Sequence, residues 1–121
     1  MSRRIRYGTV LLSVIFVLGC GLRRPSNEDL VKADYGSYPT NYEEIIKSHM
    51  KLSLFDPYSA VYEFQGAPTP GWQNHFGTIY YGYRGFVLIN AKNRMGGYVG
   101  IKRYVYMIRN YNVLFMGENY D

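Results

Sequence analysis

Residues 84–97 read RGFVLINAKNRMGG, an apolar run followed by a polar, glycine-ended hexapeptide, and this stretch decides the fold that we predict. A short apolar run bounded by turn residues is typical of a buried strand, so we expect a central strand over 84–91. Residues 92–97 have the composition of a turn. Residues 98–109 (YVGIKRYVYMIR) are rich in aromatic and β-branched residues, which favours a second long strand with a bend at Gly100. The sequence therefore predicts a hairpin of two long strands.

Shorter elements flank this hairpin. Segments of β-rich composition predict further strands at 60–64, 78–81 and 113–116. Turn-forming residues predict turns at 56–59 and 110–112. We expect a loop over residues 65–75 (QGAPTPGWQNH), because two prolines and two glycines interrupt every regular pattern there.

An amphipathic helix is predicted to begin near Thr40. Thr40 and Glu43 have the spacing of a capping box. One helical stripe follows at Tyr42, Ile45, Ile46, His49 and Met50. The charged residues outside this stripe are Glu43, Glu44, Lys47 and Lys51. The stripe must be buried against a sheet, so we predict an α+β fold, with one amphipathic helix packed on a small, mostly antiparallel sheet of three to five strands.

The N-terminal region has the layout of a secretory signal. Arg3, Arg4 and Arg6 precede an uncharged run over residues 7–22. This run has sixteen residues, fewer than the roughly 20 that a membrane-spanning helix needs. A short uncleaved anchor remains the alternative.

Residues 17–20 (VLGC) resemble a bacterial lipobox. This resemblance implies diacylglycerol on Cys20, cleavage before it and acylation of the new amino group. In enteric-type lipoproteins, Asp after the cysteine favours retention in the inner membrane. This chain has Gly21, which implies an outer-membrane lipoprotein facing the periplasm.

These features divide the chain into three parts. Residues 1–19 are the predicted signal peptide, residues 20–38 the lipidated cysteine and a flexible tether, and residues 39–121 a single domain. A flexible tether of this length has a mean reach of about 20–25 Å. We therefore expect the folded domain to stand clear of the lipid surface.

Two internal elements point to a family. Residues 54–60 (LFDPYSA) resemble an L-x-D-P-x-S-A element, and residues 89–100 (INAKNRMGGYVG) contain an N-A-K-N-x-x-G-G-Y-x-G element. Behind a lipobox, they resemble a family of small proteobacterial envelope lipoproteins. The resemblance implies a shared fold over most of residues 40–109, and it brings no activity or catalytic residue.

Composition argues against several functions. Loss of residues 1–19 would remove three arginines, so 11 basic residues would face 9 acidic ones and the net charge would fall from +5 to +2. This charge is only weak support for nucleic-acid binding, which needs a clustered basic face, so we expect no nucleic-acid partner. The two histidines, His49 and His75, lie far apart in sequence, and the chain has one cysteine. We therefore predict no cofactor, no metal and no enzymatic activity.

We expect the protein to bind a partner protein in the envelope, as a docking module or as an accessory component of an assembly. Lys92, Asn93, Arg94 and Met95 form the predicted contact patch, with a simple polar turn as the alternative. The alternative function is binding of peptidoglycan or another glycan by aromatic stacking on Trp72, Tyr80 and Tyr81. In the competing interpretation, Trp72 only closes its loop over the core.

The first prediction concerns Cys20. Mass spectrometry of the mature N-terminus should show an acylated Cys20 as the first residue, as the lipobox resemblance implies. Several acyl chains at this position would anchor the protein firmly to a bilayer. An unmodified chain that still starts at Met1 would contradict the lipoprotein interpretation.

Overall fold

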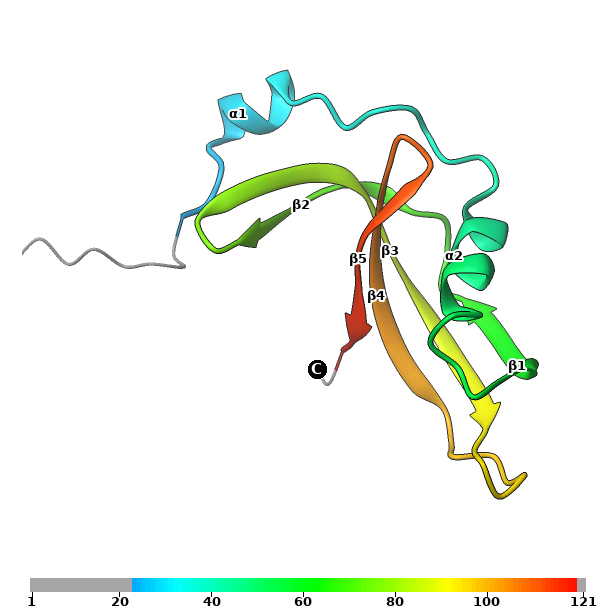
Figure 1. Cartoon of the computed structure of the whole chain (residues 1–121). Coiled ribbons are helices and arrows are strands. Elements are labelled where there is room, and N and C mark those ends of the chain that lie inside the picture. The colour runs from blue at the N-terminus through cyan, green and yellow to red at the C-terminus, as the bar shows by residue number, and fades with distance from the viewer. Residues whose placement is uncertain (1–22, 120–121) are drawn as a thin grey trace, which may run out of the picture.

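The computed structural model describes residues 23–119 and confirms the α+β class. Two short helices accompany a five-stranded sheet whose strand pairs are all antiparallel (Figure 1). The helices are α1 (Asn27–Lys32) and α2 (Tyr42–Met50). The strands are β1 (Asp56–Phe64), β2 (Thr69–His75), β3 (Thr78–Lys92), β4 (Lys102–Arg109) and β5 (Asn112–Glu118).

Strand β3 is the centre of the sheet. It spans 15 residues and joins the two separate strands predicted at 78–81 and 84–91 into one. β4 pairs with one edge of β3, and β5 continues the sheet beyond β4. Both β1 and β2 also pair with β3, β1 with its C-terminal part and β2 with its N-terminal part. Strands β1 and β2 thus follow one another along the same edge of β3, with a break at residues 65–68.

The predicted loop over residues 65–75 is wrong for residues 69–75, which form β2. Pro70 pairs with Tyr83 within this strand. Proline has no N–H to donate, but a strand at the edge of a sheet tolerates it, and β2 pairs with β3 alone. The predicted turn at 56–59 likewise belongs to a strand, since β1 begins at Asp56 and contains an irregularity before Val61.

The hairpin of β3 and β4 confirms the prediction for residues 84–109 in its main features. Residues 83–89 of β3 pair with β4, and residues 94–96 form a turn. β4 begins later than predicted, at Lys102, because the chain bends at Gly100, whose φ is +100°. Tyr98 pairs with the sheet through a single isolated bridge to Lys92 and lies outside β4.

Helix α2 packs its predicted stripe against the sheet. Ile46 and Met50 are buried, and Tyr42 and Ile45 are half-buried against the same core. The charged residues of the other side are exposed, as predicted. The capping box at Thr40 is wrong, since the helix begins after Asn41, whose side chain makes no capping hydrogen bond.

A capping box is instead present in the region predicted to be a tether. Ser26 caps α1, and its hydrogen bonds with Asp29 lower the pKa of that carboxyl. The following tyrosines, Tyr35 and Tyr38, lie edge-on against Tyr81 and Tyr83 of β3, with ring centroids 5.7 and 5.1 Å apart. Part of the region predicted to be a flexible tether thus forms α1 and packs against β3 in the described structure.

Arg109 fastens this segment to the sheet. Its guanidinium donates to the backbone oxygen of Asp34 and to that of Tyr81, the latter at 3.1 Å. The Asp34 carboxylate lies 3.5 Å from the same guanidinium. One side chain at the end of β4 thus joins the N-terminal segment and β3.

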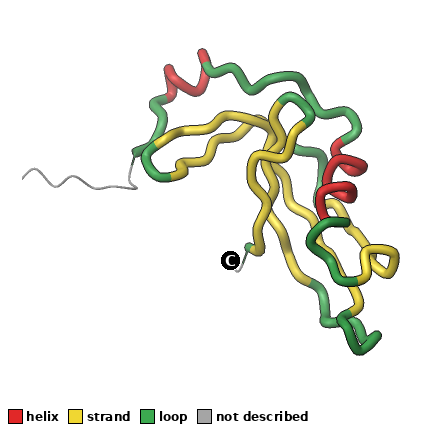
Figure 2. The backbone as a smooth tube through the Cα atoms, in the orientation of Figure 1, coloured by secondary structure: helices red, strands yellow, loops and turns green. Residues whose placement is uncertain are grey.

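Both helices lie on the outer, convex side of a strongly bent sheet (Figure 2). The core beneath α2 is formed by alternate residues of the central strands, namely Val87, Ile89, Tyr106 and Ile108. Because side chains alternate between the faces of a strand, the residues between them point to the opposite, concave face.

Close packing in this core depends on Gly85. Tyr106 is directly opposite Gly85 in the sheet, and its ring occupies the space that a side chain at position 85 would need. Burial raises the pKa of Tyr106, and its hydroxyl oxygen has no hydrogen-bond partner in the described structure. The ring therefore stabilises the fold by packing, and its hydroxyl contributes no hydrogen bond.

Substitutions at this pair test the packing argument. Gly85→Ala should destabilise the protein by about 1–3 kcal/mol, the usual cost of overpacking a core. Tyr106→Phe removes an unpartnered hydroxyl and should leave stability unchanged or slightly higher. The ring carbon that carries the hydroxyl lies practically as close to an added Cβ as the hydroxyl itself, so the clash persists without the hydroxyl and the double variant should be destabilised about as much as Gly85→Ala alone. Denaturant unfolding measures all three, and a Gly85→Ala variant as stable as the wild type would contradict the account.

Candidate functional site

The concave face of the sheet is not covered by any helix in the described structure. Residues that alternate with the core positions of β1, β3, β4 and β5 lie on it. They are Val61, Glu63, Arg84, Phe86, Leu88, Asn90, Arg103, Val105, Met107 and Phe115. This mixture of aliphatic, aromatic and charged groups makes the concave face the main candidate site.

The β2–β3 hairpin curls over one end of the concave face. The rings of His75 and Tyr80 both approach Phe115 of β5, each with centroids 5.3 Å apart. Met107 is buried at the bend, where Gly82 lets the strands approach closely. The hairpin therefore shields Met107 and Phe115 and leaves the β1 side of the face open.

An aromatic ring between two arginines occupies the middle of the face. The guanidiniums of Arg84 and Arg103 lie 5.5 and 4.1 Å from the centroid of the Phe86 ring. Arg103 also donates to the side chain of Gln65 at 3.1 Å. Such cation–π contacts hold the two charges in place at the surface.

A small hollow lies at the open end of the face. It encloses about 170 Å³ between β1, β3 and the chain that leads into β4. Its lining consists of Val61, Glu63, Leu88, Asn90, Tyr98 and Ile101. The Oδ1 atom of Asn90 is buried and has no hydrogen-bond donor. An orphaned buried acceptor of this kind typically costs about 1–3 kcal/mol, so Asn90 is not placed there for stability alone.

The predicted contact patch, residues 92–95, lies at the tip of the β3–β4 hairpin. The ammonium of Lys92 lies 5.4 Å from the Tyr98 ring, and the Arg94 guanidinium 5.6 Å from the Phe55 ring. Asn93 stabilises the turn, because its side-chain oxygen accepts from the backbone N–H groups of Met95 and Gly97. Met95 itself is almost fully exposed. The patch stays a prediction, with Asn93 explained by turn geometry.

The predicted stacking residues are not brought together. Trp72 and Tyr81 are cross-strand partners on the convex side, where Tyr35 packs against Tyr81. Tyr80 points to the concave side and contacts Phe115. The strand geometry that replaced the predicted loop causes this separation, since neighbouring residues of a strand face opposite ways. Trp72 borders a groove of about 500 Å³ together with Leu30, Tyr35, Pro70, Gly71, Gln73 and Arg84.

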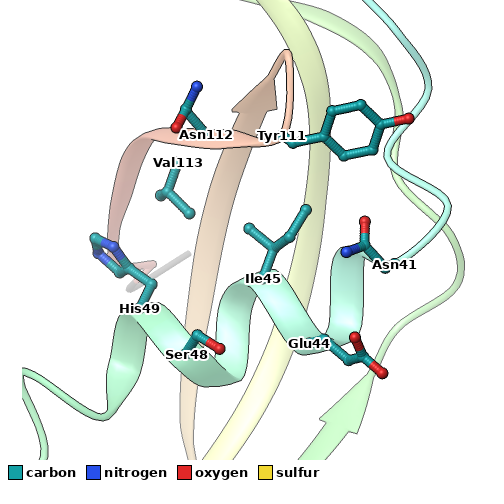
Figure 3. Close-up of a pocket in the computed structure, with 8 residues that line it drawn as sticks. All are labelled: Asn41, Glu44, Ile45, Ser48, His49, Tyr111, Asn112 and Val113. Carbon is teal, nitrogen blue, oxygen red and sulfur yellow. The ribbon is translucent and has the colours of Figure 1, made fainter.

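A further groove of about 500 Å³ separates α2 from the turn between β4 and β5 (Figure 3). Ile45 and Val113 lie between the helix and the strand, with Glu44, Ser48 and His49 along the helix side. The turn brings Tyr111 to its rim with a φ of +65°, an uncommon conformation for a bulky residue. His49 thus lines a groove at the edge of the predicted apolar stripe.

Residues 23–119 contain no cluster of three or more histidine, cysteine or acidic side chains that could hold a metal. No helix among them is long and apolar enough to cross a membrane. Cys20 lies outside the described residues. Comparison with protein-family profiles, curated sequences and solved structures finds no match to this chain.

Sequence reasoning missed the concave face as a site. The alternation of Val61 and Glu63 with Ala60, Tyr62 and Phe64 was visible in the sequence. It did not reveal which of the two sets the helix would cover, because both contain apolar residues. The bend and the pairing of β1 with β3 bring Glu63 and Asn90 to one hollow, and these are properties of the folded chain.

Charge reversal tests the hairpin tip. Lys92→Glu with Arg94→Glu would lose two exposed cation–π contacts, each worth about 0.5–1 kcal/mol, so the melting temperature should fall only slightly. The local charge would change by four units, so a partner that contacts this tip should be lost. If the variant retains every envelope partner of the wild type, the contact patch is excluded and only the turn remains.

Proposed function

We propose that this protein is a non-enzymatic, lipid-anchored component of the bacterial envelope that docks a protein partner on the concave face of its sheet. The lipobox-like residues 17–20 support the anchor, with lipid on Cys20 and an outer-membrane, periplasm-facing location. The exposed apolar groups of the concave face support the docking role.

The observation that carries the proposal is the exposure of Val61 and Ile101. These side chains are 61% and 68% exposed at the open end of the face. Full burial of an aliphatic side chain of this size stabilises a complex by about 1.5–3 kcal/mol. Together with the half-buried Leu88 between the strands, they form an apolar centre that a partner surface can cover.

The remainder of the face suits a protein rather than a lipid surface. Arginine and aromatic side chains are enriched at the centres of protein interfaces. Phe86 with Arg84 and Arg103 supplies both kinds of group beside the apolar centre. Glu63 adds an acidic group on the same face, so the surface carries both signs of charge.

The N-terminal contacts support a short anchor in place of the tether expected from sequence. The backbone oxygen of Arg23 accepts from the Asn74 side chain at 2.9 Å, near the tip of the β2–β3 hairpin (Figure 1). Arg23 follows Cys20 by three chain positions, a span of at most about 11 Å. In the proposed orientation this tip therefore lies near the bilayer, where Phe76, 95% exposed, meets the headgroup region.

Glycan binding is the second candidate function. The groove of about 500 Å³ beside Trp72 and Tyr35 favours it, because aromatic rings stack on sugars. A pull-down with purified sacculi separates this function from protein docking. Binding that disappears in Trp72→Ala would support the glycan role.

A pair of charge insertions tests protein docking. Ile101→Asp should weaken capture of the native envelope partner by at least about tenfold, because it puts an unpaired carboxylate into the apolar centre. Leu52→Asp is the matched control, since Leu52 is 90% exposed just beyond α2 and away from the face. Both variants should melt like the wild type. A partner that binds Ile101→Asp as tightly as it binds Leu52→Asp would contradict the proposal.

A further inference from the structure

The β2–β3 hairpin ends in a tight turn that exposes a phenylalanine ring. His75 pairs with Thr78, so the loop between the two strands consists of Phe76 and Gly77. Both residues have positive φ, +50° and +86°, as the central residues of a type I′ turn require. The Phe76 side chain is 95% exposed, and its ring contacts the ring of the neighbouring His75, with centroids 4.5 Å apart.

Neither the turn nor the core explains a phenylalanine at position 76. Asparagine, aspartate and glycine are the residues that suit a positive φ in such a turn, whereas a bulky side chain is strained there. The ring is not buried in return for this strain. An apolar group that strains its turn and stays exposed is expected where a molecule meets an apolar partner.

The beginning of the described chain is held beside this turn. The Asn74 side chain accepts from the backbone N–H of Gly77 and donates to the backbone oxygen of Arg23, at 3.0 and 2.9 Å. One amide group therefore connects the turn to the third position after Cys20. Figure 1 shows this turn next to the beginning of the described chain, whereas the β3–β4 turn lies at the opposite end of the molecule.

Two basic side chains accompany the exposed ring. Arg23 and Arg24 are exposed, and neither forms an ion pair with any residue from 23 to 119. Guanidinium groups bind phosphate oxygens through charge-assisted hydrogen bonds. An apolar ring with cationic groups beside it is the combination that binds the interface of a phospholipid bilayer.

We propose that the β2–β3 turn is a second membrane contact of this protein, an inference that rests on the proposed lipid anchor at Cys20. The anchor and the Asn74 contact hold the turn at the bilayer surface. Phe76 then enters the boundary between headgroups and acyl chains, which lies about 5–10 Å deep for apolar groups at an interface. Arg23 and Arg24 donate to the phosphates of the surrounding headgroups. The two attachments together hold the sheet in one orientation to the bilayer, whereas a single anchor would let it turn.

The test uses one tryptophan as a probe at either end of the molecule. Trp72 is the only tryptophan in the chain, so Trp72→Phe removes the background emission. On this background, Phe76→Trp reports on the β2–β3 turn. Met95→Trp is the matched control, because Met95 is 94% exposed at the tip of the β3–β4 hairpin. Each lipidated protein is reconstituted into vesicles of phosphatidylethanolamine and phosphatidylglycerol that carry bromine, a quencher, on their acyl chains.

The two probes should give different results. Phe76→Trp should emit at a shorter wavelength than Met95→Trp and lose at least about half of its emission to bromines close to the headgroups, because interfacial insertion is shallow. Bromines near the chain ends should quench it far less, and Met95→Trp should not be quenched. Charge reversal by Arg23→Glu with Arg24→Glu should reduce the quenching at position 76 several-fold, since both acids are repelled by the anionic lipid.

A stability measurement shows whether the Phe76 ring serves the fold instead. Asparagine suits positive φ, so Phe76→Asn should unfold at the same or a higher denaturant concentration than the wild type. A lower unfolding midpoint would show that the ring stabilises the hairpin, and the inference would be overturned.

Three fluorescence results would also overturn it: no quenching at position 76, equal quenching at positions 76 and 95, or unchanged quenching after reversal of the two arginines. The anchor fails separately. If Cys20 carries lipid and the probe at position 76 is not quenched, the anchor stands and the membrane contact of the turn is wrong. If Cys20 carries no lipid and the probe is quenched in added vesicles, the turn binds membranes and the anchor is wrong.

Discussion

Backbone hydrogen bonding of β3 is the constraint on which the other elements depend. Its 15 residues present N–H and C=O groups along both edges, and buried groups of this kind must be paired. β4 pairs with one edge, and β1 and β2 divide the other between them. The break between β1 and β2 contains Pro68 and lies opposite the middle of β3. The sheet bends, and the N-terminal segment follows its convex side.

The convex side is closed by one continuous piece of chain. Tyr35 and Tyr38 cover the arm formed by β2 and β3, Arg109 fixes the connecting backbone, and Ile46 fills the space above the central strands. In the described structure nothing equivalent covers the concave side. A sheet with one covered face and one open face that carries exposed apolar side chains is suited to docking a partner. Under the proposed lipid anchor, the three chain positions between Cys20 and Arg23 would hold this face close to the membrane.

The sequence predicted the secondary structure correctly where a single pattern dominated a segment. The apolar run 84–91, the turn after it and the stripe through Ile46 specify a helix on a hairpin, and the structure confirms all three. The sequence did not predict the structure where local residue preferences competed with strand pairing or with contacts between distant residues. Pro70 argued for a loop, yet the edge of β3 accepts it, and the tyrosines at 35 and 38 look like linker residues until their partners on β3 are known. Glu63 and Asn90 are 27 positions apart in sequence and line the same hollow only because of the strand register.

The central claim is that the concave face is covered by a partner in the cell, and cysteine accessibility tests it without knowledge of that partner. Cys20 is the only cysteine in the chain, so a single introduced thiol can be followed wherever Cys20 is acylated. Val61→Cys and Ile101→Cys should react readily with a maleimide in the purified protein and several-fold more slowly in cells with a permeabilised outer membrane. Leu52→Cys should react equally in both. If the thiols at positions 61 and 101 react as fast in cells as in the purified protein, the face is open in vivo and the account is contradicted.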